Sequence, residues 1–283
     1  MLTSAHIADT IRAAIPRAAK SLRPDALVAL RAAAAAERSP RGRAVLGQLL
    51  ENARLAEADS MPLCQDTGTV WVRIEPGAEE CVPGDLQAAI DAAVADAYRD
   101  ADLRMSVASD ALFDRTNTSD NTPAFVEIAF GVRTQPTGAT VHVMLKGGGS
   151  DNASRVVMLP PGEGIAGVRR VVLECVTEKA TGACPPLLVG VGVGATFDKV
   201  GALAKKALLR EIGSTNPDAH AAAFEADLLA LVNATGIGPA GLGGDVTALA
   251  VHLATAPCHI AALPVAVNLG CSAIRSVTVE VGA

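Results

Sequence analysis

The stretch PLCQDTGTV at residues 62–70 gathers a cysteine, an amide, a carboxylate and two hydroxyls within six residues. A glycine, Gly68, interrupts these polar groups, and an apolar run with Val, Trp and Ile follows directly. This order indicates a polar loop at the start of a β-strand, where a rigid scaffold can position reactive side chains. The same pattern also fits a polar turn around a structural cysteine, so the stretch alone leaves both interpretations open.

The six cysteines are widely spread, and none forms a CxxC pair. Without a signal peptide, a chain of this size is not expected to hold a disulfide framework, and classical zinc spacing is absent. Cys64, Cys184 and Cys271 lie beside glycine, proline or polar turns, and thiolates favour soft metals and iron–sulfur clusters. The other three lie in apolar or helical context and are predicted to be structural: Cys81, Cys175 and Cys258.

A four-iron cluster held by only three cysteines leaves one iron without a protein ligand, and that iron can act as a Lewis acid on a substrate hydroxyl. Such a site also needs an acid or base, and cations or amides that bind substrate carboxylates. The chain supplies these groups in Asp66, His259, Arg104 and Gln65, and the backbone of residues 147–149 can approach an anion closely. The alternative for this triple glycine is a flexible exit from a hairpin.

The first 59 residues predict three helices that would support these groups. Thr3 or Ser4 can cap the first helix, whose isoleucines recur every four residues, and Pro24 can open the second. The third is expected over about residues 42–58. Further helices are expected at 86–98, 163–181, 198–212 and 217–232.

Strands are expected from residue 69 onwards, mixed with these later helices. Residues 125–132 and 139–145 are separated by turn residues, which predicts an antiparallel hairpin. Other strands are expected at 69–74, 246–254, around Pro264 and at 276–281. We therefore expect an α+β fold with N-terminal helices followed by mixed helices and largely antiparallel strands, as one domain over residues 1–283.

Composition and charge narrow the possible partners. Hydrophobic residues make up 50% of the 283 residues but aromatic residues only 2%, and the net charge is −6. The absence of a basic block and the few aromatic side chains argue against binding to nucleic acid. No run of about eighteen apolar residues occurs, and the N-terminus is amphipathic rather than a signal peptide. We expect a soluble, cytoplasmic protein with no membrane association.

A glycine pattern at residues 190–194, GVGVG, raises the possibility of a nucleotide-dependent enzyme. The pattern is similar to the dinucleotide-binding fingerprint GxGxxG only loosely. The glycine spacing differs, and no clear acidic residue closes a following strand. We therefore do not predict a dinucleotide site here.

Five motifs taken together resemble a known family. In chain order they are PLCQDTGTV, LKGGGSDNAS, TGACPP, GIGPAGLGG and CHIAALPVAVNLGCSA. They resemble the N-terminal domain of class I, iron–sulfur-dependent fumarate hydratases, and equally the α subunit of two-chain fumarases and of L-tartrate dehydratase. The resemblance extends from about residue 60 to residue 275. It implies the fold of the fumarase class I N-terminal domain.

The resemblance implies a role for each residue that matches a family motif. Three cysteines would bind a [4Fe–4S] cluster: Cys64, Cys184 and Cys271. Asp66 would be the acid or base, with His259 lining the site as the other candidate for proton transfer. The substrate would contact Gln65, Arg104, which binds a carboxylate, and the backbone of the glycine loop at Gly148.

The resemblance also implies an incomplete active site. Single-chain members continue into a second domain that supplies further basic residues, whereas this chain stops at Ala283. We therefore expect the α subunit of a hydro-lyase that requires a separate β subunit, in an αβ or α2β2 assembly. The expected reaction adds or removes water on a four-carbon dicarboxylate, fumarate/malate first and L-tartrate as the alternative. A non-catalytic iron–sulfur scaffold subunit is the hypothesis from another class.

Overall fold

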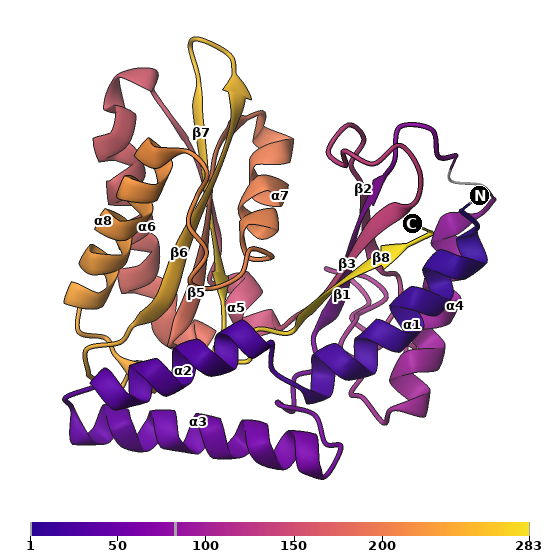
Figure 1. Cartoon of the computed structure of the whole chain (residues 1–283), viewed down its shortest axis with the longest axis horizontal. Helices are drawn as coiled ribbons and strands as arrows, with labels where there is room; N and C mark the ends of the chain where they lie inside the picture. Colours follow the sequence, from indigo (N-terminus) through magenta and orange to yellow (C-terminus); the bar gives the residue numbers. More distant parts are fainter. Residues whose placement is uncertain (1, 82–83, 283) are drawn as a thin grey trace. The chain divides into compact units, whose positions relative to one another are not determined.

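A computed structural model describes residues 2–81 and 84–282 of the chain (Figure 1). The chain forms two compact units, each assembled from separate segments. Unit 1 comprises Met1–Arg23, Ala53–Gly148 and Arg275–Ala283, and unit 2 comprises Pro24–Asn52 and Gly149–Ile274. Helices and mixed sheets occur in both units, which confirms the α+β class. The single domain over residues 1–283 stays a prediction.

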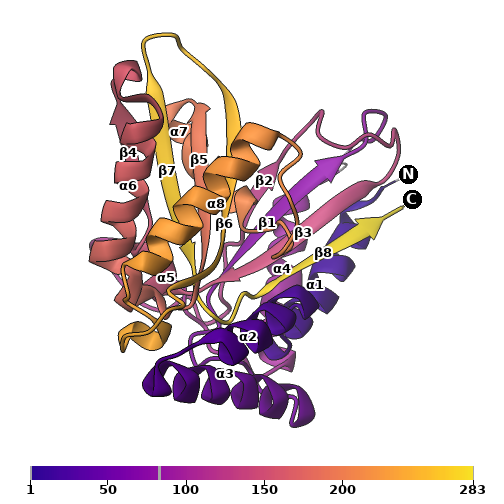
Figure 2. The same cartoon turned by 60° about the vertical axis from the view of Figure 1, so that its left-hand side comes forward.

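Unit 1 is a four-stranded sheet with two helices packed against one face. Figure 2 shows the strands side by side in the order β2-β1-β3-β8. Strand β1 pairs in parallel with β2 and antiparallel with β3, which pairs antiparallel with β8. The strands are β1 (Thr69–Pro76), β2 (Phe125–Ile128), β3 (Ala139–Lys146) and β8 (Ser276–Val281), and the helices are α1 (Ser4–Lys20) and α4 (Leu86–Asp100).

The first helix forms as its sequence predicts. The hydroxyl oxygen of Thr3 accepts a hydrogen bond from the His6 amide at 3.2 Å and so caps helix α1. Ile7, Ile11 and Ile15 are fully buried on one face of the helix. They pack with the apolar face of the sheet in one core, which holds β1 and β3 in place.

The predicted hairpin of residues 125–132 and 139–145 is wrong. Strand β1 lies between β2 and β3, so these two strands do not pair with each other. Strand β1 is buried along almost its whole length and is therefore suited to a central position, whereas β2 has only four residues and is exposed or half-buried. Proximity in sequence favoured a local pairing, but burial of β1 on both faces decides the order.

Unit 2 is a four-stranded sheet covered by helices on both faces. The strand order is β4-β7-β5-β6, and only the β5–β6 pair is parallel. Helices α6 and α8 lie on one face and α7 on the other (Figure 1). The strands are β4 (Arg155–Leu159), β5 (Leu187–Ala195), β6 (Ala248–Cys258) and β7 (Leu263–Gly270).

Most helices of unit 2 begin and end within about two residues of the predicted bounds, but the helix predicted at 198–212 ends at Ala207. Helix α2 (Pro24–Ala36) opens on proline as expected, and α3 (Pro40–Ala58) begins in unit 2 and ends in unit 1. Short helices flank the strands: α5 (Gly148–Asn152), η1 (Pro161–Glu163), η2 (Ala180–Ala183) and η3 (Pro239–Gly241). The three covering helices are α6 (Gly164–Lys179), α7 (Phe197–Ala207) and α8 (Ala219–Ala234).

The GVGVG pattern lies inside strand β5 and not in a phosphate-binding loop. A Cβ atom at Gly190 would lie 2.2 Å from the Ala204 carbonyl oxygen, and one at Gly192 would lie 2.7 Å from the Val200 carbonyl oxygen. Both residues are therefore glycine because helix α7 packs closely on this strand.

Within the described residues, one segment is long and apolar enough to cross a membrane by length and composition alone, Ala219–Gly241. It contains helix α8, where the buried carboxylate of Glu225 accepts hydrogen bonds from Arg210 at 2.8 Å and from the Leu253 amide at 2.6 Å. A helix of a soluble core passes the same test, so the segment is weak evidence for a membrane span.

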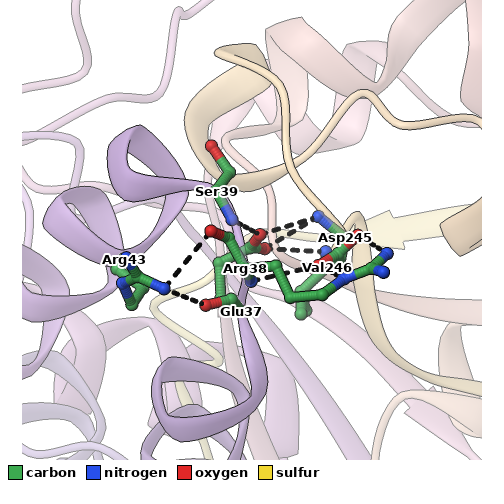
Figure 3. Close-up of polar contacts among 6 residues, drawn as sticks. All are labelled: Glu37, Arg38, Ser39, Arg43, Asp245 and Val246. Carbon is green, nitrogen blue, oxygen red and sulfur yellow. Dashed lines mark hydrogen bonds and ion pairs between the residues drawn. The ribbon is translucent and has the colours of Figure 1, made fainter.

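A buried carboxylate between α2 and α3 anchors a glycine-rich loop of unit 2 (Figure 3). Glu37 is 1% exposed and accepts hydrogen bonds from the amides of Asp245 at 2.8 Å, Ser39 at 2.9 Å and Val246 at 3.1 Å. The Arg38 guanidinium adds a forked ion pair to Asp245, but its side chain is 86% exposed, so this pair contributes little stability.

The anchored loop, residues 236–247, in turn contacts the start of strand β5. The Leu187 amide donates to the Thr247 carbonyl at 2.9 Å, and the Ala240 amide donates to the Pro185 carbonyl at 2.7 Å. Because Pro185 follows Cys184 directly, Glu37 helps to fix the segment on which a predicted cluster ligand lies.

Replacing Glu37 with Gln is expected to lower the free energy of unfolding by about 2 kcal/mol, because the amide cannot accept from all the buried N–H groups that now point at it. Urea denaturation followed by circular dichroism measures this change. Glu57→Gln, at an exposed position of α3, is the matched control and should leave stability within about 0.5 kcal/mol. Equal stability of the two variants would contradict the anchoring role.

Candidate active site

The CQDTG loop of unit 1 leads into strand β1 through a turn that requires glycine. Gly68 has φ +81°, and a Cβ atom there would lie 2.8 Å from the carbonyl carbon of Lys146. The turn directs both oxygens of Asp66 to backbone amides: Oδ1 accepts from Gly68 at 3.0 Å and Oδ2 from Gly148 at 2.8 Å. The carboxylate is therefore held in one orientation by two different segments of the chain.

Two buried side chains hold the carbonyl groups of this loop. The Tyr98 hydroxyl is within hydrogen-bonding distance of the carbonyls of Thr67 at 3.0 Å and Gly68 at 2.9 Å. Burial raises the pKa of Tyr98, so the phenol keeps its proton and stays a donor. The Asn121 side chain also donates to the Gly68 carbonyl at 3.2 Å, while its oxygen accepts from the Ser106 amide at 2.7 Å.

The predicted substrate-binding residues of unit 1 lie around this loop. The Thr67 hydroxyl donates to the Arg104 carbonyl at 2.6 Å, which fixes the Arg104 backbone beside the loop while its side chain is exposed. Gln65 is exposed, and its side-chain oxygen lies 3.4 Å from the sulfur of the half-buried Cys64. Unit 1 therefore brings together Cys64, Gln65, Asp66, Arg104 and Gly148.

The position of Gly148 refines its predicted role. Its amide already donates to Asp66, so in this arrangement the glycine orients the carboxylate. Direct contact of this backbone with a substrate stays a prediction.

Unit 2 presents two of the predicted cysteine ligands at the same end of its sheet. Cys184 follows helix η2 with left-handed backbone angles, φ 54° and ψ 70°, and is exposed. Its carbonyl accepts a hydrogen bond from the Ser272 amide at 3.1 Å, and Ser272 follows the half-buried Cys271. Leu188, near the start of β5, pairs with Gly270, at the end of β7, so the two cysteines lie at the same end of these strands.

The other three cysteines differ among themselves. Cys175 is buried in helix α6, its sulfur lies 3.3 Å from the Ala153 carbonyl oxygen, and burial raises its pKa to about 11. This confirms a structural thiol at that position. Cys81 and Cys258 are exposed, so the expectation that they lie in apolar surroundings is wrong.

His259 lies at the opposite end of the unit 2 sheet from Cys184 and Cys271. It is exposed in the turn between β6 and β7, and the neighbouring Cys258 pairs with Ala195 at the far end of β5. Strand β7 separates this turn from Cys271 by eight residues, roughly 25 Å at about 3.3 Å per residue. Unit 2 therefore does not bring the histidine together with its two cysteine ligands.

The three predicted ligands are divided between the units. Cys64 belongs to unit 1, whereas Cys184 and Cys271 belong to unit 2. Among residues 2–81 and 84–282, no group of three or more His, Cys, Asp or Glu side chains is arranged to hold a metal ion. The donor chemistry nevertheless fits an iron–sulfur cluster, because the three thiols lie on loops, outside the apolar core, and two of these loops are joined by a hydrogen bond.

Sequence reasoning missed two residues of this site. Tyr98, the only tyrosine in the chain, lies in an alanine-rich helix that carried no other signal. Arg275 donates from its guanidinium to the Asp66 carbonyl and is 4% exposed. Its position four residues after Cys271 is the one signal that could have indicated it.

Comparison with known proteins identifies the family of this chain. The family model described as "Fumarate hydratase (Fumerase)" matches residues 8–280. A protein of Methanocaldococcus jannaschii named "Putative L(+)-tartrate dehydratase subunit alpha" is 37% identical over 273 residues, 95% of each chain. The L(+)-tartrate dehydratase subunit alpha of Escherichia coli is 35% identical over 249 residues, 88% of this chain and 82% of the relative. The chain therefore belongs to the fumarate hydratase (Fumerase) family.

Proposed function

We propose that the chain is the α subunit of a hydro-lyase that removes water from a hydroxylated four-carbon dicarboxylate. The observation that carries this proposal is the Asp66 carboxylate, fixed by two backbone amides and two residues away from a predicted cluster ligand. A base in a fixed orientation is what abstraction of a proton from carbon requires. A scaffold subunit without catalysis would have no use for it.

The comparisons favour L(+)-tartrate as the substrate. From the sequence alone it came second, after fumarate/malate. The relatives at 35–37% identity are named for tartrate dehydratase, while the family description names fumarate hydratase. Both substrates carry two carboxylates, and malate and tartrate carry the hydroxyl that leaves as water. Fumarate/malate is therefore retained as the second candidate.

The cofactor that supports this chemistry is a [4Fe–4S] cluster held by Cys64, Cys184 and Cys271. When bound, the iron without a protein ligand would supply a Lewis acid for the departing hydroxyl. The contact between the Ser272 amide and the Cys184 carbonyl supports two of these ligands, and the loop that carries Asp66 supports the third.

The chain's own residues would bind the substrate and move a proton. Asp66 takes the proton from the carbon next to the one that loses its hydroxyl, because its orientation is already set. The exposed Arg104 guanidinium binds a carboxylate of the substrate. Gln65, which lies next to Asp66 on the same loop, donates a hydrogen bond to the substrate. Fixing the substrate in this way lowers the entropic part of the barrier.

His259 stays a prediction as a second group for proton transfer. It lies roughly 25 Å along the sheet from Cys271, so within one chain it does not reach a cluster bound at that cysteine. A separate β subunit fits the subunit names of the relatives. We infer a cytoplasmic αβ or α2β2 enzyme in which the β subunit supplies further cationic groups.

Assay of the complex with its β subunit tests the proposed function. The anaerobically reconstituted complex should release water from L(+)-tartrate faster than from malate. Absorbance measures the two products, which are the keto acid from tartrate and fumarate from malate. Faster turnover of malate would select the second candidate instead. Turnover of neither acid would contradict the hydro-lyase assignment.

The cysteine assignment predicts a specific pattern of alkylation by iodoacetamide. Reconstitution with iron and sulfide should protect Cys64, Cys184 and Cys271, while the exposed Cys81 and Cys258 remain reactive. Cys175 should react slowly in both states, because the thiolate is the reactive form and burial raises its pKa to about 11. Peptide mass spectrometry measures each site.

Substitution provides the matched controls for this pattern. Cys184→Ser should abolish the [4Fe–4S] absorbance, and Cys258→Ser should retain it. An unchanged cluster signal in the Cys184 variant would show that the ligand assignment is wrong.

Asp66→Asn should lower kcat by about 10² to 10⁴-fold, because the amide cannot accept the proton. The cluster absorbance should persist, which separates loss of the base from loss of the cofactor. Asp59→Asn, at an exposed position of the same unit, should leave kcat unchanged. A kcat for Asp66→Asn within a factor of three of wild type would exclude Asp66 as the base.

A further inference from the structure

We propose that Arg275 is a positioning residue that holds Asp66 and the glycine turn in the geometry needed for the reaction. The inference rests on the proposed function, because it assigns Arg275 a role in that same site. Arg275 does not need to touch the substrate for this role; it acts through the backbone of Asp66 and through Gly147.

The contacts of Arg275 join three segments of unit 1. Its guanidinium Nη1 donates to the Asp66 carbonyl, and its own carbonyl accepts from the Leu145 amide at 2.9 Å. A Cβ atom at Gly147 would lie 3.0 Å from Nη2 of Arg275 and 3.2 Å from Oδ2 of Asp66. The guanidinium therefore lies between the Asp66 loop and the glycine turn that orients the Asp66 carboxylate.

The burial of Arg275 is costly for a residue with a purely structural function. Arg275 is 4% exposed, and its buried Nε has no hydrogen-bond partner among the described residues. A buried cation with an unsatisfied N–H group lowers stability and calls for an explanation. The nearby Asp66 carboxylate compensates part of this cost, so removing either charge leaves the other in a less favourable environment.

The place of Arg275 in the chain makes the coupling more specific. It follows Cys271 by four residues and immediately precedes β8, whose Ser276 pairs with Met144 of β3. The β3–β8 ladder thus fixes the Arg275 backbone, and the side chain extends from this fixed point to Asp66. Lysine would retain the charge but not the planar fork that spans Asp66 and Gly147.

One variant with a matched control tests this role. Arg275→Lys keeps the charge, and Arg133→Lys is the control because Arg133 is also a buried arginine of unit 1, 3% exposed in its side chain. Arg133 hydrogen-bonds Thr140 at 2.8 Å and pairs with Glu280, away from the Asp66 loop. The experiment uses the complete α chain, both alone and in the reconstituted complex.

Amide hydrogen exchange of the α chain provides the first readout. Arg275→Lys should increase exchange at least about fivefold in peptides covering residues 63–70 and 144–149, while Arg133→Lys leaves these peptides at the wild-type rate. Exchange in Arg275→Lys equal to wild type would overturn the proposal. An equal increase in both variants would also overturn it, because that result indicates general destabilisation.

Kinetics of the complex with L(+)-tartrate or malate provide the second readout. Arg275→Lys should lower kcat about tenfold to a hundredfold while KM changes less than about threefold and the cluster absorbance is retained. Unchanged kcat in this variant overturns the proposal even if exchange increases. If the wild-type complex turns over neither acid, the hydro-lyase function fails, and the exchange experiment still decides whether Arg275 positions the loop.

Discussion

The CQDTG loop depends on donors for the backbone carbonyls that it buries. Thr67 and Gly68 carry carbonyl groups within unit 1, and an unpaired buried carbonyl costs about as much as a lost hydrogen bond. Tyr98 and Asn121 provide the donors, and burial keeps the Tyr98 phenol protonated by raising its pKa. With its carbonyls held, the loop keeps the Gly68 amide in place to donate to Asp66, which gives the carboxylate a defined orientation.

The chemistry of the site is distributed over segments that are far apart in sequence. In unit 1, the amide of Gly148 and the guanidinium of Arg275 reach the same residue, Asp66. In unit 2, the Ser272 amide joins the segments of two predicted cluster ligands. The chain passes between the units at Gly148–Gly149 and at Ile274–Arg275, so two site motifs coincide with these passages.

Local patterns predicted much of the fold but not its strand order. The cap and isoleucine spacing of α1 and the exact bounds of the last strand, 276–281, were predictable because neighbouring residues determine them. The hairpin failed because burial of β1 on both faces is a property of the whole sheet. In the candidate site, the motif indicated Asp66 as a candidate. Tyr98 and Arg275 contact this loop from positions 30 and 209 residues away in sequence, and no local pattern contains such contacts.

We propose that this chain contributes three cysteine ligands to a cluster whose remaining iron meets the substrate. Mössbauer spectroscopy of the complex reconstituted with ⁵⁷Fe tests this claim most directly, because it resolves individual iron sites. Addition of L(+)-tartrate or malate is predicted to change the isomer shift and quadrupole splitting of one iron in four and to leave the other three unchanged. A spectrum that is identical with and without both acids, or one without a four-iron cluster, would contradict the account.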